Sequence, residues 1–108
     1  ISTTPPTAAR PNPSRRESRA FPYVLVVQSE LLDEMATRVV LPLTPVLLLH
    51  GKPVARLHPC VEIDGESFVV FTHLLGTLPT QHLKKRIANL GDQQHAFVAA
   101  LDQLFSGI

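Results

Sequence analysis

The chain has 108 residues, of which 44% are hydrophobic and 18% charged, with a net charge of +1 when histidine is neutral. This composition is typical of one globular domain and excludes a disordered chain. The near-neutral charge gives no general attraction to nucleic acid or to an anionic membrane. The single cysteine, Cys60, excludes an intrachain disulfide and fits a reducing compartment. The sequence has no apolar run of about 20 residues and no signal-peptide segment, so we expect a cytoplasmic protein with no membrane contact.

Residues 1–18 contain four prolines and show almost no apolar alternation. Because proline donates no N–H to a strand ladder, we expect a poorly ordered arm with, at most, a short and degenerate edge strand. The arm and the residue after it are basic. The arm is either a solvated tail or a site for an acidic partner segment or phosphates. Its cations are Arg10, Arg15, Arg16 and Arg19.

Two segments rich in β-branched residues predict strands at Phe21–Gln28 and Arg38–Leu43. The continuous apolar run from Val24 to Val27 indicates burial on both faces of the first strand. Pro42 predicts that the second strand ends there or lies at a sheet edge.

The segment between these strands, Ser29–Ala36, is typical of a turn or a short helical piece. Its adjacent leucines, Leu31 and Leu32, lie between acidic residues. They either pack at a hinge or form an exposed apolar contact for a partner.

The middle of the chain predicts a β-hairpin. Leu57–Ile63 and Ser67–Thr72 have strand-like sequences, and the Asp64-Gly65 pair between them suits a tight turn with positive φ. Before the hairpin, Thr44–Leu49 is either strand or helical turn, and His50–Arg56 is a loop with two cations.

The segments after the hairpin are less regular. Gly76 and Pro79 predict that strand pairing breaks in Leu74–Pro79. The next segment, Gln81–Leu90, fits either a last strand or a helical turn.

The C-terminal segment Gly91–Ile108 predicts an amphipathic helix over about residues 92–106. Asp92 is a candidate N-cap, and Gly107 can end the helix in the left-handed region. The apolar residues fall on one stripe, which either packs on the core or presents the chain end to a partner. These residues are Phe97, Leu101, Leu104, Phe105 and Ile108. Many short strands followed by one helix predict a mainly β fold, a small antiparallel barrel or sheet with a terminal helix.

No catalytic or metal-binding pattern is present. The five histidines show no metal-ligand spacing with Cys60 or with one another, and the carboxylates Glu62, Asp64 and Glu66 flank an exposed turn. No nucleophile motif or phosphate-binding glycine loop occurs. The sequence therefore favours binding over catalysis, and we expect no enzyme activity, cofactor or metal.

The order of several segments resembles the CcdB family, the toxins of bacterial toxin–antitoxin pairs that poison DNA gyrase. The resemblance runs nearly ungapped from about Phe21 to Ile108. It is carried by VVQSELLD (Val26–Asp33), RVVLPL (Arg38–Leu43), HPCVEIDGESF (His58–Phe68), Leu78-Pro79 and LFSGI (Leu104–Ile108).

The resemblance implies a toxin domain over residues 19–108, built as an SH3-like barrel that forms a homodimer. It implies binding to the DNA gyrase A subunit and trapping of the cleaved gyrase–DNA complex, with DNA contacted only through gyrase or the antitoxin complex. Roles in plasmid maintenance and transcription autoregulation follow from the same family. The implied gyrase-binding residues are Leu31, Leu32, Asp102, Phe105, Ser106, Gly107 and Ile108.

The resemblance also implies a cognate antitoxin whose disordered C-terminal tail wraps the barrel. An acidic tail would suit the cations of the matching surface. The implied antitoxin-binding residues are Arg16, Arg19, His50, Gly51, Lys52, Pro53 and Arg56.

The chain departs from the family in two places. Ser106 stands where the best-known member has Trp, and the prolines near the start do not reproduce the family's alternating first strand. Two alternatives to a gyrase poison follow. One is a non-toxic homologue that keeps only the fold and antitoxin binding. The other is a small nucleic-acid-binding barrel that uses Arg10, Arg15, Arg16, Lys84, Lys85 and Arg86.

Overall fold

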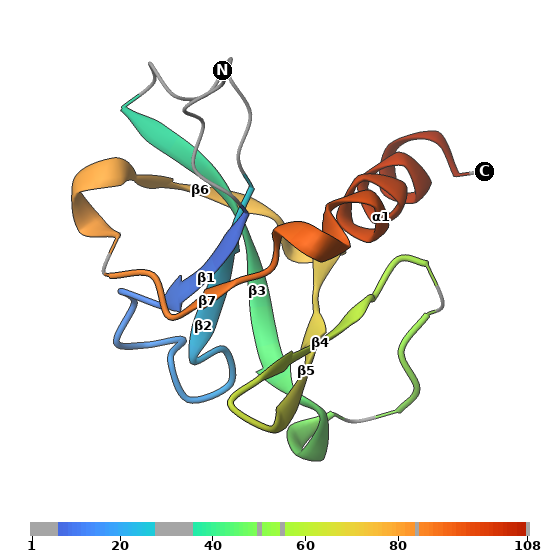
Figure 1. Cartoon of the computed structure of the whole chain (residues 1–108), viewed down its shortest axis with the longest axis horizontal. Helices are drawn as coiled ribbons and strands as arrows, with labels where there is room; N and C mark the ends of the chain where they lie inside the picture. The colour runs from blue at the N-terminus through green and yellow to red at the C-terminus, as the bar shows by residue number, and fades with distance from the viewer. Residues whose placement is uncertain (1–6, 28–35, 50, 55, 84, 108) are drawn as a thin grey trace.

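The computed structural model describes residues 7–27, 36–49, 51–54, 56–83 and 85–107. Within these residues the chain forms one antiparallel sheet, four 3₁₀ turns and one α-helix (Figure 1). The strands are β1 (Ala8–Pro11), β2 (Tyr23–Val26), β3 (Thr37–Pro45), β4 (Cys60–Ile63), β5 (Glu66–Val70), β6 (Gly76–Pro79) and β7 (Ala88–Asn89). The 3₁₀ turns are η1 (Val46–Leu48), η2 (Thr72–Leu74), η3 (Thr80–His82) and η4 (Gly91–Gln93), and the helix is α1 (Gln94–Ser106).

The long strand β3 organises the sheet. Its first half pairs with β6, its second half pairs with β5, and its other edge pairs with β2. The strand order is β4-β5-β3-β2-β1-β7, with β6 beside β3. Figure 1 shows β3 running through the centre of the molecule, with β1 and β2 on one side and the β4–β5 hairpin on the other. Because β3 changes partner along its length, the sheet curves into a nearly closed barrel, which confirms the predicted fold class.

The strand β1 lies inside the sheet, between β2 and β7, and is not the edge strand that the prolines suggested. Its first residues, Ala8 and Ala9, are fully buried because small side chains fit beneath the neighbouring strands. The two prolines Pro11 and Pro13 fall at the end of the strand and in the following loop, where a missing N–H is tolerated.

Two other predictions are wrong. Pro42 does not end its strand, because β3 continues to Pro45. The carbonyl of Pro42 accepts the N–H of Phe71 at 2.8 Å, so the nitrogen of Pro42 faces the side on which β3 changes from β6 to β5. Proline therefore lacks its N–H at a position where the hydrogen bonding between β3 and its neighbours on that side is already interrupted. The predicted break in Leu74–Pro79 is instead the paired strand β6.

The hairpin prediction is confirmed. Asp64 and Gly65 adopt φ values of 52° and 80° and connect β4 to β5, with Ile63 opposite Glu66. Positive φ at both central residues gives the type of turn whose twist matches the strands it joins.

The main core lies between the inner face of the sheet and α1. Leu25, Leu41 and Leu43 of the central strands, Phe68 of β5 and Phe97 of α1 are almost fully buried in it. The alternate residues of the same strands form a second cluster on the other face, where Leu78 and Leu83 cover them. This second cluster consists of Val24, Val26 and Val40, and it confirms that β2 is buried on both faces.

The helix α1 is attached to the sheet at its beginning. The hydroxyl of Thr7 donates a hydrogen bond to Oε1 of Gln94 in the first turn, and the carbonyl of Thr7 accepts the N–H of Leu90 at 2.9 Å. The predicted Asp92 cap is wrong: η4 places the N-cap position at Gln93, which makes no side-chain capping bond.

With 13 residues, α1 is short, and no helix in the described part of the chain has the length and hydropathy of a membrane span.

The unequal burial of two phenylalanines of α1 gives a matched stability test. Phe97→Ala should lower the free energy of unfolding by about 3–5 kcal/mol, because it leaves a cavity beneath the helix. Phe105→Ala, in the same helix but 75% exposed, should change it by less than about 1 kcal/mol. Chemical denaturation measures both. Equal losses would show that the two rings are buried alike.

The turn at Gly65 gives a second test. Gly65→Ala should destabilise the fold by about 1–2 kcal/mol, because a Cβ is strained at positive φ. Gly76, in β6, has an ordinary φ and equally open space around it, so Gly76→Ala is the control and should not lose stability. Thermal or urea unfolding compares the two, and an equally tolerated Gly65→Ala would contradict the turn geometry.

Candidate functional site

The exposed end of α1 is the first candidate site. Phe97 and Ala100, near the beginning of the helix, are buried, Leu101 and Leu104 are half-buried, and Phe105 is 75% exposed. In Figure 1 the last turns of α1 point away from the sheet toward the edge of the molecule. The predicted apolar stripe therefore divides, since its first part packs on the core and its later part faces solvent.

Two hydrogen bonds hold the last turn in place. The hydroxyl of Ser106 donates to the carbonyl of Asp102 at 2.6 Å. The N–H of Gly107 donates to the carbonyl of Gln103 at 3.0 Å, with φ of 71° at Gly107. The expected glycine cap is confirmed, and it satisfies a carbonyl that would otherwise lack a partner in the helix. The Ser106 hydroxyl is engaged within the helix, and the neighbouring Phe105 is a large apolar side chain that is exposed.

The structure brings four predicted gyrase-binding residues together. Asp102, Phe105 and Ser106 lie in the last turns of α1, Gly107 follows as its C-cap, and all four are exposed. Residues three and four apart on a helix are surface neighbours, so Asp102 lies beside Phe105 and Ser106. The other three predicted residues, Leu31, Leu32 and Ile108, lie outside the described residues.

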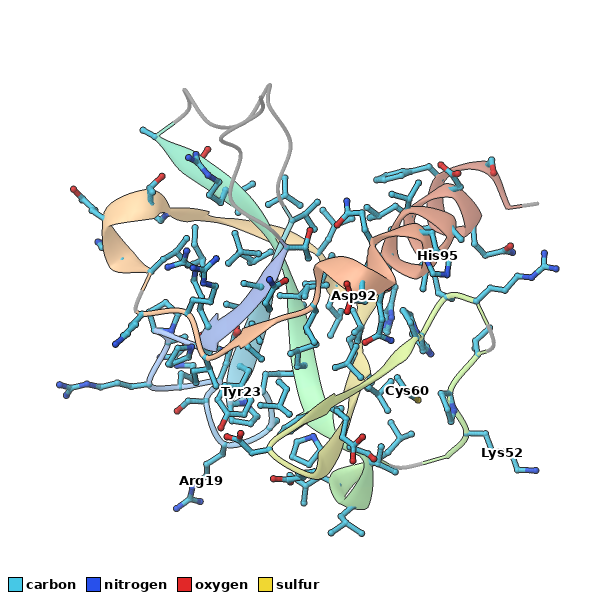
Figure 2. The ribbon with its side chains drawn as sticks, viewed as in Figure 1. Arg19, Tyr23, Lys52, Cys60, Asp92 and His95 are labelled. Atoms are coloured by element: carbon cyan, nitrogen blue, oxygen red, sulfur yellow. The ribbon has the colours of Figure 1, made fainter. Side chains whose placement is uncertain are left out.

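The predicted antitoxin-binding residues form two separate patches. Arg16 and Arg19 are exposed on the loop between β1 and β2, whereas Gly51, Lys52, Pro53 and Arg56 are exposed on the loop between η1 and β4. Figure 2 shows the Arg19 and Lys52 side chains on opposite sides of the β4–β5 hairpin. His50 lies outside the described residues. A partner that contacted both patches would have to extend across this part of the molecule.

The loop that carries the first patch is ordered by Asn12. The Asn12 N–H donates to the carbonyl of Pro22 at 2.9 Å, and its side-chain amide donates to the carbonyl of Phe21 at 2.8 Å. The Asn12 side-chain oxygen also accepts the N–H of Ser14 at 2.9 Å. The cations of this patch therefore project from a closed loop with a defined backbone.

A cluster of rings that we did not predict lies beside the second patch. The Nε2 of His58 lies 2.9 Å from Nδ1 of His73, and the Nδ1 of His58 accepts the N–H of Val54 at 2.9 Å. Phe71 stacks on His58 with ring centroids 5.4 Å apart and contacts Phe21 edge-on at 5.5 Å. Burial, and second the neighbouring His73, lower the pKa of His58 below its ordinary value of 6.5.

The register of the hairpin is enough to predict that these rings lie close together. Counting outward from the Asp64-Gly65 turn, Pro59 falls opposite Val70, and His58 falls opposite Phe71. His73 is two residues beyond Phe71, and two-residue spacing keeps side chains on one face. The spacing of the histidines along the chain, which fits no metal site, gives no indication of this arrangement. Within the described residues, no group of three His, Cys, Asp or Glu side chains is placed to hold a metal ion.

Exposed apolar residues and a shallow groove adjoin the ring cluster. Leu47 of η1 is 92% exposed, and Leu48 and Val54 are about half exposed. A cavity of about 250 Å³ opens beside η1, with Phe21 and Phe71 in its wall. Its other lining residues are Ala20, Thr44, Leu48 and Leu49. Large exposed apolar side chains of this kind are typical of surfaces that contact other proteins.

The fold defines a structural class, the small antiparallel barrels with a single C-terminal helix. Comparison with protein families matches residues 10–107 of the chain to the CcdB protein family. Because this match covers nearly the whole chain, the chain belongs to the CcdB family.

Solved structures with the same fold include other toxins. The Mycobacterium tuberculosis toxin MazF-mt6 is 20% identical with a TM-score of 0.65, over 94% of this chain and 96% of that one. Another Mtb toxin is 22% identical with a TM-score of 0.62, over 77% and 91%. An endoribonuclease in complex with its cognate antitoxin, from a mycobacterial species, is 13% identical with a TM-score of 0.69, over 97% and 96%. At these identities the similarity establishes a shared fold.

Proposed function

We propose that the chain is the toxin of a toxin–antitoxin pair and acts by binding the DNA gyrase A subunit, without catalysing a reaction. Membership of the CcdB family and the toxin barrels among the structural neighbours support the toxin assignment. The observation that carries the gyrase assignment is the exposed Phe105 ring on the tip of a helix whose other end is buried.

The mechanism requires only differential binding. A toxin that binds the cleaved gyrase–DNA state more tightly than the resealed state shifts gyrase toward the cleaved state. The helix α1 is suited to this because its packed beginning fixes the direction of its tip. Little conformational freedom is then lost when Phe105 is buried by a partner.

A homodimer would present two such tips together. In this proposal the gyrase contact comprises Asp102, Phe105, Ser106 and Gly107, together with Leu31, Leu32 and Ile108, whose positions lie outside the described residues. Doubling the tip matters because Ser106 replaces an aromatic anchor, and two linked contacts bind more tightly than one.

The proposed antitoxin contacts the two basic patches with an extended acidic tail in the cytoplasm. The molecule measures 40 × 34 × 23 Å, so a tail of a dozen or so extended residues, at roughly 3.3 Å each, reaches from one patch to the other. The neighbouring endoribonuclease was solved with its cognate antitoxin, which supports a partner of this kind for a barrel of this fold.

Phe105→Ala should weaken binding to the purified gyrase A subunit by about tenfold or more, because a desolvated aromatic anchor contributes on the order of 2 kcal/mol. Val98→Ala, at an exposed position earlier in α1, is the control and should bind as the unaltered chain does. Calorimetry gives both affinities. Expression in a gyrase-sensitive bacterium should arrest growth for the control and not for Phe105→Ala.

Three outcomes would count against the proposal. Unchanged affinity of Phe105→Ala would remove the helix tip from the gyrase contact. Normal growth with intact gyrase binding would favour the non-toxic homologue. RNA cleavage by the purified protein, with growth arrest that survives Phe105→Ala, would favour an RNA-cleaving toxin.

The charge reversals Lys52→Glu and Arg56→Glu, made together, should lower the affinity for a peptide of the antitoxin's acidic tail by roughly tenfold at low salt, since surface ion pairs contribute about 0.2–1 kcal/mol each. Lys85→Glu, also exposed but on another segment, is the control. The difference should shrink as salt is raised. Equal affinities for the two variants would place the tail elsewhere.

A further inference from the structure

Three groups form a directional chain of hydrogen bonds between the loop at residues 51–59 and η2. The N–H of Val54 points at Nδ1 of His58, and Nε2 of His58 lies 2.9 Å from Nδ1 of His73. A backbone N–H can only donate, so Nδ1 of His58 must carry its lone pair. Neutral His58 then has its proton on Nε2 and donates it to Nδ1 of His73. Every nitrogen in the chain is thereby assigned.

This chain is complete only when both rings are neutral. A proton added to Nδ1 of His58 would face the N–H of Val54, so two donors would oppose each other. A proton added to Nδ1 of His73 would face the Nε2–H of His58. If His58 instead accepted the bond from His73 at Nε2, neutral His58 would carry its own proton on Nδ1. That proton would again oppose the N–H of Val54. Any extra proton therefore breaks at least one link.

We propose that Val54, His58 and His73 form a proton-sensitive clasp that holds the loop to η2 near neutral pH and releases the loop when either imidazole becomes charged. The loop carries Lys52 and Arg56. The clasp therefore controls the position of the second antitoxin patch, and this consequence alone rests on the proposed function.

The two sides of the clasp are held unequally. On the η2 side, Thr72 is fully buried, α1 packs against η2, and the N–H of Leu75 donates to the carbonyl of Thr72 at 3.2 Å. On the loop side, Gly51, Lys52, Val54 and Arg56 are all exposed. The loop side is therefore the one expected to move when the chain of hydrogen bonds breaks.

The loop backbone also contains two left-handed residues, Gly51 and Arg56, with φ values of 90° and 71°. Positive φ is unfavourable for a side chain such as that of Arg56, so this conformation must be held by its surroundings. Val54 is bound to His58 twice, through its N–H to the ring and through its carbonyl to the N–H of His58 at 2.9 Å. Losing the ring bond removes one of these two restraints.

The pKa of His58 is lowered by burial and then by His73, which agrees with a pair that resists the first proton. Because the folded state binds that proton less readily than the unfolded chain, the clasp's stabilising contribution is present above pH 6.5 and decreases as pH falls below 6.5. Other titratable groups lie on the segments packed around the pair and need controls. They are Lys52 and Arg56 of the loop, Cys60 and Glu62 of β4, Glu66 of β5, and His95 and Asp102 of α1.

Nuclear magnetic resonance tests the clasp without any partner. In ¹⁵N-labelled protein, at a pH where the imidazole nitrogen signals report neutral rings, couplings across the hydrogen bonds should join Val54 N to His58 Nδ1 and His58 Nε2 to His73 Nδ1. When the pH is lowered until the imidazole nitrogen signals report protonated rings, both couplings should disappear, and the amide signals of Gly51, Lys52 and Val54 should shift together. Couplings that persist after the rings are protonated would overturn the proposal.

Two variants replace a histidine by phenylalanine, which keeps an aromatic ring but has no nitrogen that can be protonated. His58→Phe should leave the loop amide signals insensitive to pH over this range. His73→Phe should keep the Val54 coupling and raise the pKa of His58 toward 6.5. His82→Phe, at an exposed position in η3, is the control, and its loop amide signals should change with pH as those of the unaltered protein do. Loop signals that still titrate in His58→Phe would assign the change to another group and overturn the proposal. Because no gyrase or antitoxin is present, these outcomes are independent of the proposed function.

Discussion

The packing of Phe97 against the sheet is the contact on which the rest of the molecule depends. This ring is the buried aromatic that the helix contributes to the main core, which also contains Leu25, Leu41 and Phe68 from three strands. It also fixes the direction of α1 relative to the barrel, together with the bond from Thr7 to Gln94. Since α1 has no side-chain cap at its beginning, tertiary packing must supply what local capping does not. In the proposed function, the exposed tip can serve as a contact surface because the helix behind it cannot turn freely.

The sequence predicted the elements whose signals are local. The β4–β5 hairpin follows from Asp64-Gly65, β2 follows from a run of β-branched residues, and α1 follows from apolar spacing that ends at Gly107. Each signal is contained in a few consecutive residues, so no knowledge of distant strands is needed. The prediction that Asp92 caps the helix was wrong, because a 3₁₀ turn precedes the helix and the helix begins two residues later than expected.

The elements that escaped prediction are held by distant partners. β1 is short and contains Pro11, yet it is buried because β2 and β7 pair with its two edges. β6 pairs with the first half of β3, some 40 residues earlier in the chain. Pro42 is tolerated because its nitrogen faces the point where β3 changes partner. Local propensity contains no information about which strand will lie alongside, so tertiary pairing overrode it in each case.

The candidate site divides in the same way. Asp102, Phe105, Ser106 and Gly107 are consecutive or nearly so, and a helix necessarily brings them together. The basic residues come from two loops far apart in sequence, and only the barrel decides that Arg19 and Lys52 face different sides. The His58–His73 pair lies between these cases. Its register can be counted from the hairpin turn, but the bond from Val54 depends on a loop conformation with two positive φ values.

The clasp and α1 are both in contact with η2, and the way η2 is held allows the clasp to open without moving the helix. η2 packs against α1 and β3, and its first residue, Thr72, is fully buried. His73, the next residue, is exposed and reaches the loop. A charge on His73 therefore acts on the solvent side of a turn whose other side is fixed in the core. Opening the loop does not require α1 to shift, so the surface that we propose for the antitoxin can change while Phe105 keeps its position.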